Sequence, residues 1–313
     1  MPESFFIVSK EYLELAVDEV VTLAKMYDRF SKIKTISNLV IIQSKTPWEK
    51  IAGRATFVKT AGQLIRKMSN VFFDEKNYSI LFGAKSFMCK AINLSGRQVD
   101  IPEIERSLGS MVVTFCNATV SLDSPDVVIY LIFTDEENFF GFSRGFAEPE
   151  RPKKAVKFHH ELDWKLTRAM INLAKIRDGE TLCDPFCGTG STLLEARSMG
   201  INAVGIDFDK KMCQISQKNL KANNFDSPVF NQNWDYMLQL KYDGIVTDLP
   251  YGTASRVSEP PQKMMQSFIS KIPKKKKFAI MCKKGMEDNI KVKLTKKYEI
   301  YRHKSLTRMI LVK

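Results

Sequence analysis

The spacing of apolar residues divides the 313-residue chain into strands and helices along its whole length. Apolar runs at 5–8 and 39–42 predict two strands, and segment 11–26 between them has the spacing of an amphipathic helix. Further runs predict strands at 78–82, 87–91, 118–122, 127–133 and 139–142, with a helix at 101–116. We therefore expect two small α+β units before about residue 145.

A regular β-α-β rhythm occupies the second half of the chain. Segment 146–160 is rich in proline and charge and is typical of a linker. After it come a predicted helix at 162–175 and strands at 181–184, 203–207, 229–232, 244–247 and 278–282. Runs at 298–301 and 309–312 predict a closing antiparallel hairpin. This order predicts an α/β domain over 161–313 with a class I (Rossmann-like) methyltransferase fold.

Four aspartates, Asp184, Asp207, Asp235 and Asp248, stand in order at or just beyond the ends of predicted strands. Ligands of open α/β sheets bind beyond the carboxyl ends of the strands, so we expect these side chains to meet at one edge. Asp207 is placed to accept the two hydroxyls of a ribose, and Asp235 could accept the amino group of an adenine. Trp234 could pack on the adenine ring or lie in the core; the sequence leaves both open.

The loop after Asp184 has the composition of a cofactor loop. Gly188 and Gly190 let the backbone approach a ligand, and the helix predicted to start at Ser191 offers free amides. A dinucleotide fingerprint would need a third glycine, where this chain has Leu193. Asp184 would repel a pyrophosphate and favours the sulfonium and ammonium groups of S-adenosylmethionine, which we therefore expect as the cofactor.

The segment Asp248-Leu249-Pro250-Tyr251 could act on an amino group. Pro250 keeps Leu249 extended, so the Asp248 carboxylate and the Leu249 carbonyl could accept both protons of one planar amine. Asp248 could then take the leaving proton as a general base, and Tyr251 could stack on a base flipped out of its stem. Taken alone, the segment is equally compatible with a solvated turn.

Composition restricts the partners. The net charge is +13 and the pI is about 9.3, which favours a nucleic acid partner. The six cysteines include no Cys-x-x-Cys pair and only three histidines are present, so we expect reduced thiols and no metal site. No apolar run has the length of a membrane span, and we expect a cytoplasmic protein without membrane contact.

The N-terminal half resembles a THUMP domain, an RNA-binding module of RNA-modifying enzymes, in segments 87–90, 105–109 and 120–126. Residues 158–313 resemble the tRNA guanine-10 N2-methyltransferase family in segments 165–173, 184–190 and 247–252. The resemblance implies a ferredoxin-like domain at 1–69, a THUMP domain at 70–145, a linker at 146–160 and a catalytic domain at 161–313. It also implies an archaeal source, mono- or dimethylation of guanosine at position 10 of tRNA, and a monomer that does not act on DNA, with a small activator protein as an open question.

We assign the site residues from the strand-end pattern and the family resemblance together. Those assigned to catalysis are Asp248, Leu249, Pro250 and Tyr251. Those assigned to the cofactor are Thr167, Asp184, Pro185, Phe186, Gly188, Thr189, Gly190, Asp207, Phe208, Asp235 and Asp248. The chain departs from the family at Leu249, where proline is usual; because the carbonyl is retained, we expect an active enzyme, and Leu249→Pro to leave activity intact or improve it.

Three alternatives remain open from the sequence. The target could be another guanine of tRNA or rRNA, or the adenine N6 of DNA, because the same amino-binding segment serves all of these reactions. The catalytic half could also be an inactive platform in an RNA-binding protein, which only Leu249 supports. A thiouridine synthetase is disfavoured because no Ser-Gly-Gly-x-Asp-Ser loop is present.

Overall fold

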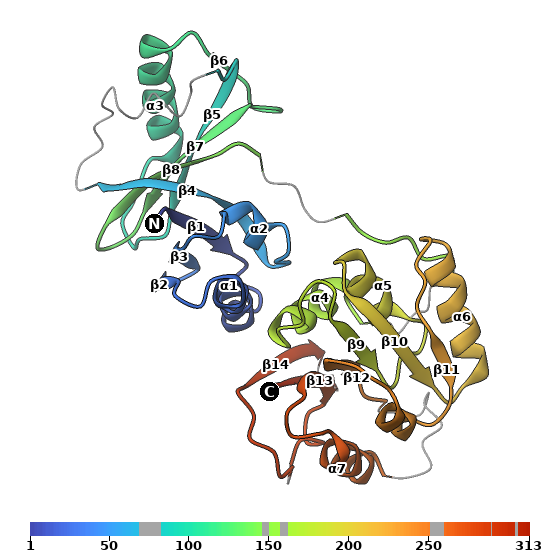
Figure 1. The fold of residues 1–313 in the computed structure, drawn as a ribbon. Coiled ribbons are helices and arrows are strands. Elements are labelled where there is room, and N and C mark those ends of the chain that lie inside the picture. Colours follow the sequence, from blue (N-terminus) through green and yellow to red (C-terminus); the bar gives the residue numbers. More distant parts are fainter. Residues whose placement is uncertain (69–82, 146–149, 157–161, 251–259, 289, 304–305) are drawn as a thin grey trace. The chain divides into compact units, whose positions relative to one another are not determined.

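The computed structural model describes residues 1–68, 83–145, 150–156, 162–250, 260–288, 290–303 and 306–313 (Figure 1). The chain forms two compact units. Unit 1 is Met1–Gly53 with Phe57–Glu148, and unit 2 is Arg54–Thr56 with Pro149–Lys313. The predicted strand at 78–82 lies outside the described residues.

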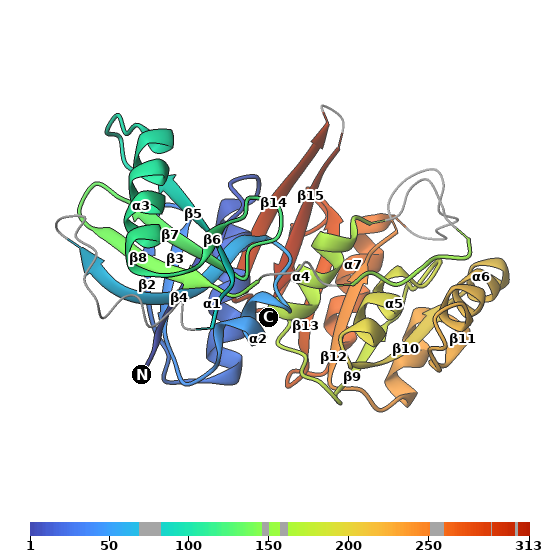
Figure 2. The same cartoon turned by 90° about the horizontal axis from the view of Figure 1, so that it is seen from above.

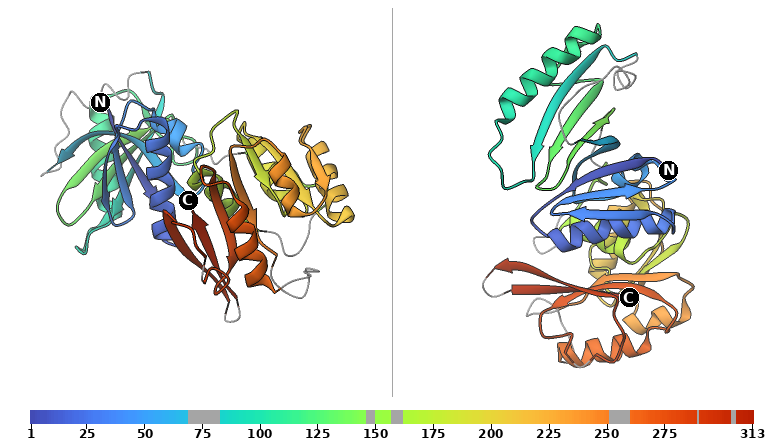
Figure 3. Two further views of the ribbon diagram at one scale, coloured as in Figure 1. Left: turned by 60° about the horizontal axis from the view of Figure 1, so that its bottom comes forward. Right: turned by 90° about the vertical axis from the view of Figure 1, so that its left-hand side faces the viewer.

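Unit 1 contains one eight-stranded sheet in the order β2-β3-β1-β4-β8-β7-β5-β6. Its strands are β1 (Glu3–Val8), β2 (Lys32–Ile36), β3 (Leu39–Gln43), β4 (Val58–Met68), β5 (Ser86–Asn93), β6 (Thr119–Val120), β7 (Val127–Phe133) and β8 (Asn138–Ser143). Its helices are α1 (Leu13–Tyr27), α2 (Trp48–Ala52) and α3 (Ile101–Phe115). Helix α3 lies against β5, as Figure 3 shows.

The sheet of unit 1 continues across both predicted N-terminal domains, because β4 pairs antiparallel with β8. Two glycines permit this pairing. A Cβ atom on Gly62 would lie 2.3 Å from the Phe142 carbonyl oxygen, and one on Gly141 would lie 2.6 Å from that of Gln63. The ring of Phe5 fills the space above both glycines, 2.8 and 2.9 Å from the same Cβ positions. The two halves of unit 1 therefore share one continuous backbone ladder.

Unit 2 is a seven-stranded sheet in the order β11-β10-β9-β12-β13-β15-β14. Its strands are β9 (Thr181–Asp184), β10 (Asn202–Asp207), β11 (Val229–Asn231), β12 (Gly244–Asp248), β13 (Lys277–Lys283), β14 (Lys296–His303) and β15 (Leu306–Val312). Strands β9 to β13 are parallel, and β15 is antiparallel to β13 and β14. Numbered within the unit, the order is 3-2-1-4-5-7-6, which confirms the predicted class I methyltransferase fold and its closing hairpin.

Helices cover the sheet of unit 2 (Figure 2). They are α4 (Trp164–Leu173), α5 (Ser191–Ser198), α6 (Lys210–Lys221), α7 (Pro261–Lys271) and the 3-10 helix η2 (Trp234–Gln239). Helices α4, α5 and α6 contact one another in series, whereas α7 contacts η2. Phe268 of α7 is fully buried in an apolar cluster of this unit that also contains Ile245 and Phe278. None of the helices in the described parts of the chain is long and apolar enough to span a bilayer.

Candidate cofactor and amine-acceptor site

Three of the four predicted acids lie along the carboxyl edge of the unit 2 sheet. Asp207 ends β10, Asp184 ends β9 and Asp248 ends β12, and these three strands are adjacent and parallel. Asp235 follows β11 in η2 and is exposed to solvent. The β-α-β rhythm therefore predicted the strand-end placement of Asp207, Asp184 and Asp248 correctly, because their strands run in the same direction, whereas Asp235 lies in η2 and not at a strand end.

Asp184 lies beneath the loop that follows it. Its Oδ1 atom accepts hydrogen bonds from the Thr247 hydroxyl at 2.6 Å and from the Phe186 amide at 3.1 Å. Burial raises the pKa of Asp184 to about 6, and its hydrogen bonds partly oppose this rise. The carboxyl group thus joins the loop to β12. Its predicted contact with a cofactor stays a prediction.

Asp207 fixes the same loop from the neighbouring strand. Its two oxygens accept hydrogen bonds from the amides of Gly188 and Asp209, each at 2.9 Å. Burial raises the pKa of Asp207. A carboxylate has about four acceptor positions, so these two bonds leave room for the hydroxyls of a ribose. Asp209 also caps α6 by accepting from the Lys211 amide at 2.8 Å.

Asn231 was missed by the sequence reasoning. Its side-chain amide donates to the carbonyls of Asp207 at 3.1 Å and Phe208 at 2.8 Å, so β11 holds the backbone at the end of β10. The Phe208 side chain is 52 % exposed beside this edge. An exposed aromatic ring next to Asp207 is suited to packing against an adenine.

The glycine loop depends on left-handed backbone at two positions. Gly188 has φ 50° and Gly190 has φ 84°, a region that costs other residues about 1–2 kcal/mol. A Cβ atom on Gly190 would also lie 2.4 Å from the Ser216 hydroxyl. The carbonyl of Thr189 accepts from the Asn219 side chain at 3.0 Å. The loop is therefore held open in one conformation, and its acidic surroundings suit a cationic ligand.

Asp248 faces a cation from the closing hairpin. Its Oδ2 atom lies 3.5 Å from a terminal nitrogen of Arg308 on β15. The next residue, Leu249, donates its amide to the Met281 carbonyl at 2.9 Å, and its side chain is 1 % exposed in the core. Pro250 is described, whereas Tyr251 lies outside the described residues.

Thr167 is buried near the site, and Phe186 and Trp234 are half-buried beside it. The Thr167 hydroxyl donates to the Asp163 carbonyl at 3.0 Å, and Thr167 is fully buried. The rings of Phe186 and Trp234 both meet Phe268 edge-on, with centroid distances of 5.3 and 5.4 Å. Trp234 is half-buried and packs against the core through Phe268, and its packing on an adenine ring stays a prediction.

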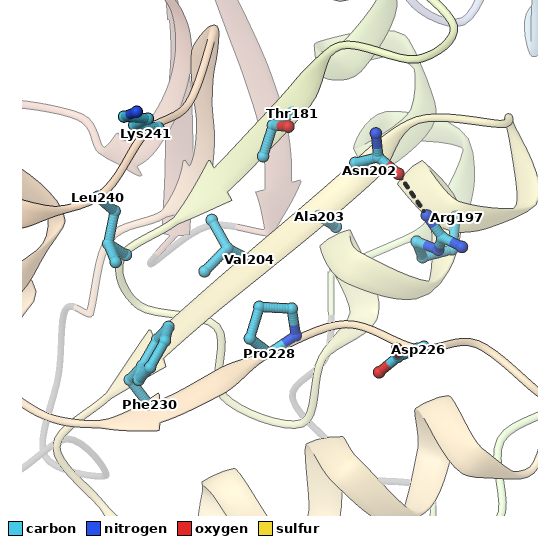
Figure 4. A pocket seen from close by; sticks show the side chains of 10 residues that line it. All are labelled: Thr181, Arg197, Asn202, Ala203, Val204, Asp226, Pro228, Phe230, Leu240 and Lys241. Carbon is cyan, nitrogen blue, oxygen red and sulfur yellow. Dashed lines mark hydrogen bonds between the residues drawn. The ribbon is translucent and has the colours of Figure 1, made fainter.

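Two hollows border unit 2. One of about 320 Å³ lies where β9, β10 and β11 begin, lined by Thr181, Asn202 and Pro228 among others (Figure 4). It opens at the edge of the sheet opposite the three acids. A larger hollow of about 710 Å³ lies beside the start of α5, with Lys154, Thr167 and Ser191 in its lining. Within the described ranges, no group of three His, Cys, Asp or Glu side chains could hold a metal ion.

Comparison with known proteins assigns the family. A family model described as "RMKL-like, methyltransferase domain" matches residues 151–304. A probable tRNA (guanine(10)-N2)-dimethyltransferase of Methanothermococcus thermolithotrophicus is 34% identical, over 47% of this chain and 96% of that protein. The chain belongs to the tRNA (guanine(10)-N2)-dimethyltransferase family. The family resemblance predicted from the sequence is confirmed.

The likeness to this family extends beyond unit 2. The tRNA (guanine(10)-N2)-dimethyltransferase of Methanocaldococcus jannaschii is 25% identical over 98% of each chain. The crystal structure of TrmN from Thermus thermophilus matches with a TM-score of 0.62 at 17% identity, covering 100% of this chain and 99% of that one. The fold of a methyltransferase preceded by an N-terminal unit is therefore shared along the full length.

Proposed function

We propose that this protein transfers methyl groups from S-adenosylmethionine to the exocyclic N2 of guanosine in tRNA, at position 10. The observation that carries the proposal is the row of Asp207, Asp184 and Asp248 along one sheet edge, with the glycine loop between the first two, in a member of this family. When bound, S-adenosylmethionine supplies an electrophilic methyl group on a sulfonium. The chain's part is to bind this cation and to present the amine.

The cofactor would lie over the carboxyl ends of β9, β10 and β11. Asp207 would accept from the ribose hydroxyls and Asp235 from the adenine amino group, with Phe208 packed against the ring. Asp184 and the loop residues Pro185, Phe186, Gly188, Thr189 and Gly190 would surround the methionine end, with Thr167 below them. Asp184 and Asp207 at the strand ends suit the sulfonium and ammonium groups of this ligand.

The guanine amine would be held by Asp248 and the Leu249 carbonyl, which together we call the acceptor clamp. The N2 lone pair is delocalised into the ring, so the amine is a weak nucleophile. Hydrogen bonds from both of its protons to the clamp raise the electron density on nitrogen and aim it at the methyl carbon. As the nitrogen gains the methyl group, Asp248 takes the proton that the nitrogen loses, as a general base. Orientation of this kind contributes several kcal/mol by removing the freedom of the reacting pair. Tyr251 would stack on the flipped base.

We further propose that unit 1 binds tRNA through a THUMP domain at 70–145 behind a ferredoxin-like domain at 1–69, with 146–160 as the linker and 161–313 as the catalytic domain. The net charge of +13 supports a polyanionic partner. On this proposal the enzyme acts as a monomer on tRNA rather than DNA, in the cytoplasm, with a small activator protein left open as a further partner.

Mass spectrometry of nucleosides from a tRNA transcript incubated with the protein and S-adenosylmethionine tests the proposal. We expect N2-methylguanosine, and no product on a transcript with adenosine at position 10. Asp248→Ala should abolish transfer while the cofactor still binds by calorimetry, and Asp226→Ala, an exposed acid at the opposite edge, should act like the parent protein. Methylation of duplex DNA in preference to tRNA, or full activity of Asp248→Ala, would refute it.

A further inference from the structure

Arg308 reaches the acceptor clamp from a strand near the C-terminus. Its terminal nitrogen lies 3.5 Å from Asp248 Oδ2 and 3.6 Å from the sulfur of Met281. The side chains are 12 % and 26 % exposed for Arg308 and Asp248, so the pair is largely shielded from water. Sixty residues separate the two in the sequence, and neither belongs to a motif that would link them.

The sheet register explains why these side chains meet. Asp248 is paired with Met281 across β12 and β13, and Met281 is paired with Ile310 across β13 and β15. Paired residues point to the same face of a sheet, and so do residues two apart on one strand. Arg308 precedes Ile310 by two positions and is paired with Lys283, which lies two residues past Met281 and so beyond the end of β12. Its guanidinium contacts Met281 and reaches the Asp248 carboxylate at the end of β12.

We propose that Arg308 is a positioning residue for methyl transfer. It fixes the carboxylate of Asp248 in one orientation and stabilises its charged form, so that Asp248 serves as a hydrogen-bond acceptor for the guanine amine. An opposite charge within about 4–6 Å favours the ionised state of a carboxyl group. A carboxylate has about four acceptor positions, so the contact with Arg308 leaves capacity for the substrate. This inference rests on the proposed function.

The alternative is a purely structural ion pair that ties the closing hairpin to the parallel sheet. The two readings differ in what the loss of Arg308 would change. A positioning residue alters the rate of the chemical step, whereas a structural pair alters stability and, through it, every binding step together. A largely buried salt bridge is weak evidence for stability by itself. The rate of methyl transfer therefore distinguishes the two roles.

The experiment compares Arg308→Met, Arg308→Lys and Lys297→Met in the full-length protein. Lys297 is an exposed cation on β14 of the same hairpin and serves as the charge-matched control. Single-turnover methyl transfer is measured at saturating tRNA and S-adenosylmethionine, alongside cofactor affinity by calorimetry and the thermal unfolding midpoint. We expect Arg308→Met to lower the single-turnover rate on the order of 10²-fold with unchanged cofactor affinity. Arg308→Lys should recover part of the rate because it restores the charge without the planar fork.

Three results would overturn the inference. These are a parent-like rate in Arg308→Met, a rate loss that Lys297→Met shares, and a loss that tracks the unfolding midpoint and cofactor affinity without recovery in Arg308→Lys. If Arg308→Met does not fold, Arg308→Gln replaces it, because glutamine keeps a polar donor group on a shorter, uncharged side chain. A parent protein that methylates no tRNA would instead refute the proposed function, so the two failures are distinct.

Discussion

The hydroxyl of Thr247 donates a 2.6 Å hydrogen bond to Oδ1 of Asp184, joining β12 to the base of the glycine loop. Thr247 directly precedes Asp248, and consecutive residues of a strand point to opposite faces. One strand therefore supports the loop with one side chain and presents the acceptor clamp with the next. The position of the loop and the position of the clamp depend on the same backbone.

Thr247→Val should weaken both the fold and cofactor binding. Valine fills the same space but lacks the hydroxyl, and Thr247 and Asp184 are both buried, so the carboxyl group loses a donor that water cannot replace. We expect a loss of about 1–3 kcal/mol in the free energy of unfolding. Denaturant titration and calorimetry with S-adenosylmethionine measure the two effects. Thr247→Ser, which keeps the hydroxyl, is the control; equal behaviour of the two variants would show that the bond contributes nothing.

Asp184 should make the protein more stable in mild acid than at neutral pH. Its folded pKa of about 6 lies above the unfolded value of about 3.9, so the folded state binds the proton more tightly. The resulting stability is fully present below about pH 4 and is lost as the pH rises through about 6. Between pH 4 and pH 8, the ionisation of Asp184 lowers the free energy of unfolding by roughly 2–3 kcal/mol.

Asp184→Asn isolates that contribution, because asparagine does not titrate and its oxygen can still accept from Thr247 and Phe186. The quantity to follow is the difference in free energy of unfolding between the parent protein and Asp184→Asn from pH 4.5 to 8. We expect this difference to shift against the parent protein as the pH rises. Asp207 also titrates with a raised pKa, but it is present in both proteins and cancels. A difference that stays constant across the range would contradict the raised pKa of Asp184.

The sequence predicted the parts of this molecule that local patterns encode. Each strand-end acid follows an apolar run, and parallel strands necessarily place such ends at one edge, so the row Asp207, Asp184 and Asp248 was accessible from spacing alone. The conformation of Gly188 and Gly190 follows from residue type in the same way. The domain boundaries predicted at 69, 145 and 160 stay predictions.

Pairings between distant strands were not accessible in this way. Nothing in the sequence near residue 308 indicates that its side chain lies two strands away from Asp248, because that depends on the register of β13 and β15. The pairing of β4 with β8, which makes one sheet of unit 1, depends likewise on Gly62 and Gly141 meeting over Phe5. Long-range register is set by packing, and packing is a property of the whole sheet.

The contact of Leu249 with β13, which the sequence did not reveal, changes the expected effect of a substitution at this position. The Leu249 amide donates to the Met281 carbonyl at 2.9 Å, and its side chain is buried in the core. Proline lacks the amide hydrogen and fills less of this space. We now expect Leu249→Pro to lower the free energy of unfolding by about 1–3 kcal/mol, while single-turnover activity persists because the carbonyl remains. Leu249→Met keeps the amide and nearly the same volume, so its unfolding curve is the reference; an undiminished stability of Leu249→Pro would contradict this expectation.

Asn219 of α6 and Asn223, two residues past the end of this helix, bind the segment that enters unit 2. Asn219 accepts from the Val156 amide at 2.8 Å and donates to the Val156 carbonyl at 3.1 Å; Asn223, one turn later, makes the same pair of bonds with Lys153. Only Asn219 also donates to the Thr189 carbonyl of the glycine loop, at 3.0 Å. The two side chains thus make the same hydrogen bonds to segment 153–156, but only Asn219 also contacts the glycine loop.

Asn219→Ala and Asn223→Ala should therefore separate two effects. Asn219 is fully buried, and its removal takes away its hydrogen bonds to the Val156 backbone and to the Thr189 carbonyl, at a cost of roughly 2–4 kcal/mol. Asn223 is partly exposed, so water can replace its bonds and about 1 kcal/mol is expected. S-adenosylmethionine affinity, measured by calorimetry at a temperature where both variants are folded, should fall in Asn219→Ala alone. An equal loss of affinity in both variants would mean that the entering segment, and not the loop carbonyl, governs cofactor binding.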